Sequence, residues 1–168
     1  MEAGAKSITP LIVLDNTILT NFALVNRADW VIDVSGADAW TTTTVMAEYE
    51  AGANGGTLPA KAWRSLIVVE LADEEAALAR RLPPRLGAGE RSCLALALNR
   101  QAIFASDDLH ARRLAQQHGL PTTGILGLLV LGVQHHHFTL AEANAALAQM
   151  IALGFRSPVT TLDDLAAL

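Results

Sequence analysis

The chain has 168 residues, of which 51% are hydrophobic and 17% are charged, and its formal net charge is −5. This length fits one domain with a substantial core, and the acidic balance excludes a uniformly basic surface that grips nucleic acid everywhere. The single cysteine, Cys93, is expected to fill the core, because one thiol cannot build a disulfide framework or a Cys-rich zinc site. The sequence contains no run of roughly 18 uninterrupted apolar residues, and its opening MEAGAKSITP does not resemble a secretory signal, so we expect a cytoplasmic protein without a membrane partner.

Short apolar runs bounded by polar or turn residues alternate with stretches that have helical spacing of apolar residues. In chain order, the predicted elements are a strand at 8–14, a helix at 17–25, a strand at 39–43, a helix at 45–51, a strand at 66–70, helices at 74–82 and 90–99, a strand at 102–106 and a helix at 109–118. Residues 28–34 are ambiguous, because WVIDV fits a strand or a short helix. The alternation predicts an α/β fold with a mostly parallel sheet and helices on both faces.

Two further segments follow Gly124. The run ILGLLVLGV predicts a buried helix or a surface that faces a partner. Thr139 and Glu142 have the spacing of a capping box, which predicts a last helix that ends near residue 153. We therefore predict a single domain over residues 1–168, with the core at 1–123 and a helical portion at 124–168.

Acidic residues follow or adjoin the ends of several predicted strands. Asp15 comes directly after the first strand, and the pair Asp107 and Asp108 follows the strand at 102–106. Glu48 lies about one turn into a predicted helix, and Glu90 lies in the first turn of another. Because ligands of open α/β sheets bind beyond the carboxyl ends of the strands, we expect these carboxylates to share one site.

Each carboxylate also has a structural interpretation. Asp15 and Asp108 could be helix N-caps, and Glu90 could complement a helix dipole. Glu48 cannot belong to a capping box, because the residue three positions earlier is Val45 rather than Ser or Thr.

Carboxylates that converge repel one another, so at least one pKa is expected to rise unless a cation neutralises the cluster. Oxygen ligands without His or Cys favour Mg²⁺ or Mn²⁺, which can activate water and stabilise the charge that develops on a phosphodiester. The leading interpretation of the sequence is therefore metal-assisted phosphodiester hydrolysis. Basic residues near the rim would have to hold the nucleic acid.

Four stretches resemble, in order, the successive motifs of PIN-domain proteins. They are LDNTIL around Asp15, AEYEAG around Glu48, GAGERSCLALAL around Glu90, and FASDDLHARRLAQQHGLPTTGILGLL around Asp107 and Asp108. The likeness is strongest to the VapC-like toxin nucleases, in particular to a subgroup with a GE-containing third motif and an Asp pair in the fourth. It extends over nearly the whole chain, including the late GFRSP stretch.

The resemblance implies a three-layer α/β/α domain and a Mg²⁺- or Mn²⁺-dependent ribonuclease. By position, Asp15 would be the first metal ligand, Glu48 the second acidic residue and Glu90 the third. The fourth motif commonly runs Thr-x-Asp, which places Asp108 on its final Asp as a further metal ligand, with Asp107 as a competing candidate. Ser106 would then occupy the position of the Thr. The chain departs from the commonest pattern at Glu90, where many relatives have an Asp further into the helix.

The resemblance also implies an RNA substrate, a cognate antitoxin and a homodimer. Arg112 and Arg113, about one turn beyond the Asp pair, are the candidate phosphate contacts. They belong to a group of seven Lys and Arg residues between positions 80 and 113, which predicts either a local basic stripe or ordinary solvated helix faces. The main alternative is a catalytically inactive PIN-like module that binds RNA or protein. A phosphatase that uses Asp15 as nucleophile is less favoured, because Thr17 stands where a second Asp would be needed.

Overall fold

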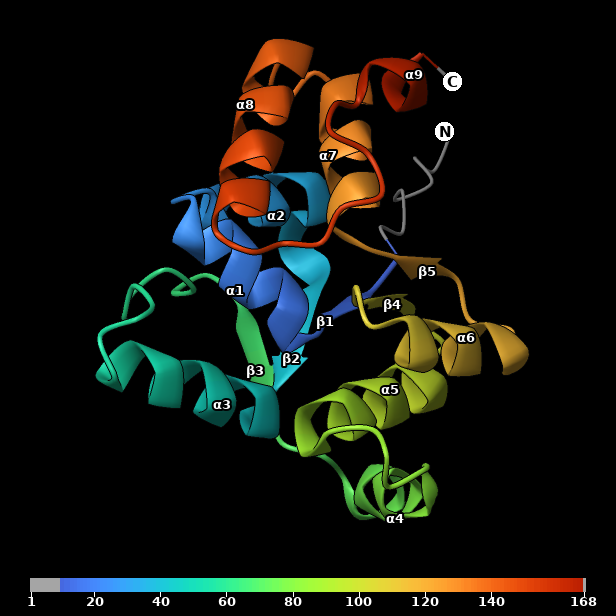
Figure 1. Ribbon diagram of the computed structural model, residues 1–168. Coiled ribbons are helices and arrows are strands. Elements are labelled where there is room, and N and C mark those ends of the chain that lie inside the picture. Colours follow the sequence, from blue (N-terminus) through green and yellow to red (C-terminus); the bar gives the residue numbers. More distant parts are fainter. Residues whose placement is uncertain (1–9, 168) are drawn as a thin grey trace, which may run out of the picture.

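The computed structural model describes residues 10–167 and shows a parallel β-sheet between two layers of helices (Figure 1). Within these residues the sheet has five strands in the order β3-β2-β1-β4-β5, and every neighbouring pair is parallel. The strands are β1 (Ile12–Leu14), β2 (Ala39–Thr42), β3 (Ile67–Val69), β4 (Ile103–Ala105) and β5 (Thr122–Thr123). The predicted α/β class and the three-layer α/β/α architecture are confirmed.

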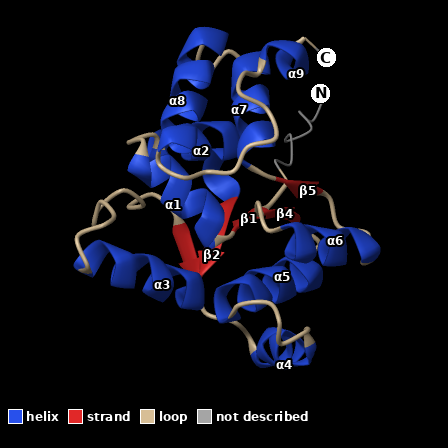
Figure 2. Ribbon diagram, viewed as in Figure 1, coloured by secondary structure: helices blue, strands red, loops and turns tan. Residues whose placement is uncertain are grey.

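The helices form two groups around the sheet (Figure 2). They are α1 (Asn16–Leu24), α2 (Ala28–Ser35), α3 (Thr43–Asn54), α4 (Asp73–Arg81), α5 (Ala88–Arg100), α6 (Leu109–Gln117), α7 (Ile125–Gln134), α8 (Leu140–Ala152) and α9 (Asp163–Ala166), with a 3-10 turn η1 at Gly36–Asp38. Helices α1, α2, α7 and α8 lie on one side, and α4, α5 and α6 lie on the other. Helix α3 packs against both α1 and α5, so helices from both groups meet beside the candidate site.

The predicted elements are present, with their ends shifted by a few residues, and residues 8 and 9 of the first predicted strand lie outside the described part of the chain. The ambiguous segment 28–34 is helical and forms α2, whose Trp30 stacks on Phe138 with ring centroids 3.9 Å apart. The short elements β5, η1 and α9 were not predicted, because they are too short to show a periodic pattern. Cys93 is fully buried, as expected.

The two predictions for the segment after Gly124 also hold. Helix α7 buries Ile125, Leu128 and Leu129, which confirms the buried-helix interpretation of the apolar run. Helix α8 begins with the predicted capping box: the Glu142 amide donates to the Thr139 hydroxyl at 3.2 Å, and the Thr139 amide donates to Glu142 Oε2 at 2.8 Å. Within residues 10–167, none of the helices combines the length and the apolar character needed to cross a bilayer.

The central strand β1 places the first acidic residue rigidly. Its side chains Ile12, Val13 and Leu14 are at most 5% exposed, and burying each contributes roughly 1.5–3 kcal/mol. Leu14 pairs in register with Ala105 of β4, and the amide of the next residue, Asp15, donates to the Ala105 carbonyl at 2.9 Å. Asp15 is therefore fixed at the carboxyl edge of the sheet by the backbone of two strands.

Candidate active site

Asp15 lies at the bottom of the candidate site with both carboxylate oxygens hydrogen-bonded. The Asn16 amide donates to Oδ1 at 2.7 Å, and the Ser106 hydroxyl donates to Oδ2 at 2.8 Å. The Thr17 hydroxyl is 3.4 Å from Oδ2 and accepts from the Asp107 amide at 3.1 Å. Asp15 is thus the N-cap of α1, as its structural interpretation proposed, and it is also held in one orientation by residues that follow β4.

The environment of Asp15 opposes its ionisation. Burial raises the pKa of Asp15 from 3.8 to about 6, although the hydrogen bonds from Ser106 and Asn16 act in the other direction. The charges of Glu90 and Glu48 add to the increase in pKa. The raised pKa of Asp15 is therefore mainly an effect of burial, and the repulsion expected between converging carboxylates makes a smaller contribution.

Glu48 reaches the site from α3 and contacts the beginning of α5. The Gly89 amide donates to Glu48 Oε1 at 3.0 Å, although the two residues are 41 positions apart. A Cβ on residue 89 would lie 2.5 Å from Oε2 and 2.9 Å from Cδ of Glu48, so only glycine fits here without moving the carboxylate. Glu48, which lacked a capping role in the sequence, caps the first turn of a different helix.

Glu90 lies in the first turn of α5. Its Oε2 accepts from the amide of the N-cap residue Gly87 at 2.8 Å, a specific hydrogen bond where the structural interpretation expected only a favourable interaction with the helix dipole. Burial raises the pKa of Glu90, and the charges of Asp108 and Glu48 raise it further, while the Gly87 amide and His110 lower it. Glu90 therefore stabilises its own helix and also interacts electrostatically with Asp108 and Glu48.

A cavity of about 320 Å³ brings three of the predicted acidic residues together: Asp15, Glu48 and Glu90 all line it. The remaining lining residues are polar side chains of α1 and glycines that precede Glu90, namely Asn16, Thr17, Thr20, Asn21, Gly87 and Gly89. We refer to this space as the acidic cavity. Three of the four acidic segments that the sequence placed at comparable positions thus line one cavity.

The members of the Asp pair point to different places. Asp108 is the N-cap of α6, where its Oδ1 accepts from the Ala111 amide at 2.7 Å, and its charge acts on Glu90. Asp107 instead accepts from the Ile125 amide at 3.1 Å, at the beginning of α7. Burial raises the pKa of Asp107, against the opposing effects of the Ile125 amide and Arg112. Both residues border a second, larger cavity rather than the acidic cavity itself.

The donor atoms suit a hard cation, although the described residues do not form a closed cage. Among residues 10–167, no group of three or more His, Cys, Asp or Glu side chains is arranged closely enough to hold a metal ion as placed. In the same range, Oε2 of Glu48, Oε1 of Glu90 and Oδ2 of Asp108 accept no hydrogen bond from the protein. Free carboxylate oxygens without nitrogen or sulfur donors are what Mg²⁺ and Mn²⁺ prefer, so the donor set fits these ions.

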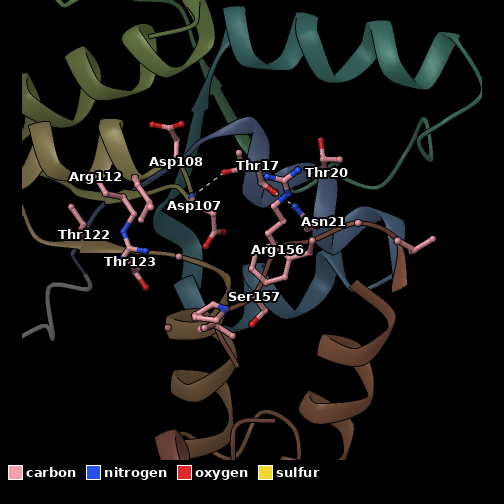
Figure 3. Close-up of a pocket in the computed structure, with 18 of the residues that line it drawn as sticks. Thr17, Thr20, Asn21, Asp107, Asp108, Arg112, Thr122, Thr123, Arg156 and Ser157 are labelled. Atoms are coloured by element: carbon pink, nitrogen blue, oxygen red, sulfur yellow. Dashed lines mark hydrogen bonds between the residues drawn. The ribbon is translucent and has the colours of Figure 1, made fainter. Parts of the chain in front are cut away.

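The larger cavity, of about 1110 Å³, contains side chains that the sequence interpretation did not single out (Figure 3). Arg112 lines it, as does Arg156 from the loop after α8, whereas Arg113 is exposed and lines neither cavity. Arg156 belongs to the GFRSP stretch of the motif likeness, but no role could be assigned to it from the sequence, because its place at the cavity depends on where the chain returns after α8. Gly89 was also missed, although its place directly before Glu90 could have suggested a close backbone contact.

The fold is a parallel α/β/α domain whose carboxylates lie at the carboxyl edge of the sheet, where open α/β proteins bind their ligands. A family model described as a PIN domain matches residues 11–167, and the chain therefore belongs to the PIN-domain family. Comparisons with curated proteins and with solved structures give no significant match. PIN domains are generally nucleases, so family membership indicates a nuclease-type function that acts on nucleic acid.

Proposed function

We propose that this protein is a Mg²⁺- or Mn²⁺-dependent endoribonuclease that hydrolyses RNA phosphodiester bonds at the acidic cavity. The observation that carries the proposal is the gathering of Asp15, Glu48 and Glu90 around one cavity in a PIN-domain chain. The motif likeness to VapC-like toxins supports a cytoplasmic toxin that forms a homodimer and is held by a cognate antitoxin.

The residues have distinct roles in this proposal. Asp15, Glu90 and Asp108 bind the metal through carboxylate oxygens, and Glu48, held by the Gly89 amide beside Glu90, adds negative charge. When bound, the metal would activate water and stabilise the charge that develops on the phosphodiester. The Asn16 amide and the Ser106 hydroxyl keep Asp15 in a fixed orientation, so this ligand requires little reorganisation on binding.

Ser106 also connects two of the proposed ligands. Its hydroxyl donates to Asp15 and accepts from the Asp108 amide at 3.1 Å. The Thr17 hydroxyl makes a similar link from α1 to the Asp107 amide. These hydroxyl groups support the proposal because they hold the turn after β4 against the end of β1, where the substrate phosphate would have to lie.

The test is an RNA cleavage assay with Mg²⁺, Mn²⁺ or EDTA, using the wild type, Asp15→Asn and the control Asp29→Asn. Asp29 is an exposed residue in the first turn of α2, so its substitution makes the same change of charge away from the site. We expect cleavage by the wild type and by Asp29→Asn only when metal is present, and none by Asp15→Asn. Asn is itself a good N-cap, so the variant should fold. Equal cleavage by all three proteins would indicate a contaminant and would overturn the proposal.

An inactive PIN-like binding module is the second candidate. It is favoured by the hydrogen bonds that Glu48 and Glu90 already make to backbone amides, and by the lack of a closed metal cage among residues 10–167. This candidate predicts that RNA binds without being cut at any metal concentration. The cleavage assay therefore separates the two functions.

A further inference from the structure

The acidic cavity and the larger cavity share one wall. Thr17, Thr20 and Asn21 line both of them, and their spacing of three and four residues places them on one face of α1. The opposite face of α1 carries the buried residues Ile18, Leu19, Phe22 and Ala23. The polar face therefore forms a continuous path from the carboxylates into the larger cavity.

Two guanidinium groups enter this larger cavity from separate parts of the chain. Arg112 comes from α6, and Arg156 comes from the loop between α8 and α9 (Figure 3). Within residues 10–167 neither forms a salt bridge, whereas Arg100 does so with Glu75. The charge of Arg112 acts on nearby Asp107 without a salt bridge, so among the described residues both guanidinium groups keep their hydrogen-bond donors for an anion.

The carboxylates that border the larger cavity are already engaged by helix ends. Asp107 accepts from the Ile125 amide at the beginning of α7, and Asp108 caps α6 through the Ala111 amide. Helix N-termini carry partial positive charge, which offsets the charge of each carboxylate. The two arginines are therefore the charged groups best placed to set the ligand preference of this cavity.

We propose that the larger cavity is a subsite for single-stranded RNA, in which Arg112 and Arg156 bind backbone phosphates beside the phosphate in the acidic cavity. The proposal rests on the proposed function and gives the path of the substrate. Arginine binds phosphate through two parallel hydrogen bonds, which suits a repeating phosphate backbone. The volume of about 1110 Å³ exceeds the roughly 300–1,000 Å³ that is typical of small-molecule pockets, so a short length of polymer fits better than one small ligand.

The remaining lining suits unpaired bases. Leu24, Leu126 and Phe155 give the cavity an apolar side, and Leu153 at its border is 57% exposed. Bases of a single strand are free to stack on aromatic and apolar side chains, whereas bases of a duplex are not. The cavity therefore selects a single strand over a duplex.

The test measures the affinity of a fluorescent single-stranded oligoribonucleotide by anisotropy, in Mg²⁺ and over a range of KCl concentrations. The parent protein carries Asp15→Asn, so that the RNA stays intact, and the variants add Arg112→Gln, Arg156→Gln or the control Arg64→Gln. Arg64 is exposed in the segment before β3 and lines neither cavity, so its substitution makes the same change of charge away from the proposed subsite. Arg156 is also exposed, so its substitution should leave the fold intact, as thermal unfolding will verify.

We expect Arg112→Gln and Arg156→Gln each to weaken binding about tenfold, and Arg64→Gln to change it much less. Each lost phosphate contact should also reduce the slope of log affinity against log salt by about 0.7. Equal affinities of all four proteins, or no RNA binding by the parent, would overturn the subsite. If the arginine variants lose affinity but the wild type never cuts RNA, the proposed function fails and the subsite stands.

Discussion

Replacing Gly89 by alanine should impair catalysis while leaving the fold almost equally stable. The new Cβ would lie 2.5 Å from Oε2, 2.8 Å from Oε1 and 2.9 Å from Cδ of Glu48, all closer than real Cβ atoms approach other atoms. The Glu48 carboxylate must therefore retreat and lose its 3.0 Å hydrogen bond from the Gly89 amide. A displacement of about 1 Å in an active site can cost roughly 100-fold in rate, so we expect kcat/KM to fall about 10- to 100-fold.

The expected stability change follows from two opposing effects. Alanine is favoured over glycine in a helix by about 1 kcal/mol. The lost hydrogen bond to an exposed carboxylate costs a similar amount, about 1 kcal/mol. The free energy of unfolding, measured by urea denaturation, should therefore change by less than about 1 kcal/mol.

Gly87→Ala is the matched control. A Cβ on residue 87 would lie 3.6 Å from Glu90 Oε2, which is an ordinary contact. Because alanine is a poor N-cap, this variant should lose about 0.5–1 kcal/mol of stability and keep its activity, the reverse of the pattern at residue 89. Full activity of Gly89→Ala in the metal-dependent cleavage assay would refute the role given to Glu48.

Two further predictions concern pH and stability. The pKa of Asp15 in the folded protein is raised to about 6, so the metal-free protein should lose about 3 kcal/mol of stability as the pH rises from about 4 to above 6. In EDTA at pH 8, Asp15→Asn should therefore unfold at a higher urea concentration than the wild type. This difference should vanish near pH 4. Unfolding curves that coincide at pH 8 would contradict this. Burial alone would raise the pKa of Glu75, but hydrogen bonds from Arg100, the Ala72 amide and Asn99 outweigh it and hold the pKa below 4.5. Glu75→Gln should therefore lower the free energy of unfolding by about 1–2 kcal/mol at pH 7, a modest amount because Arg100 is 41% exposed and solvent screens the ion pair. The difference between variant and wild type should shrink as the pH falls below 4.5. A constant difference down to pH 3 would argue against this role of Glu75.

The sequence was sufficient for the fold because its strands and helices carry strong local signals. The apolar run that ends at Leu14 and the amphipathic helices could be placed within a few residues. Residues 28–34 could not be assigned, since their helical state depends on packing of Trp30 against Phe138, which is 108 positions away. The two-residue strand β5 is stabilised by pairing with β4 rather than by its own composition.

The candidate site was predictable in its residue types but not in its geometry. In the sequence, capping and membership of a site appeared as alternatives for Asp15, whereas in the structure one residue caps α1 and also lines the acidic cavity. The contact between Glu48 and Gly89 depends on how α3 meets α5, which no local pattern encodes. The same holds for Arg156, which reaches the larger cavity only because the chain returns there after α8.

The location of Mn²⁺ in crystals of the wild-type protein, determined from its anomalous scattering, tests the central claim most directly. We predict an anomalous peak in the acidic cavity, with oxygens of Asp15 and Glu90 at about 2.0–2.2 Å and Asp108 turned toward the ion. Crystals of Asp15→Asn grown in the same way should lack this peak. Mn²⁺ bound elsewhere, or a cavity that stays empty of metal at saturating Mn²⁺, would contradict the assignment of these carboxylates as a metal-dependent active site.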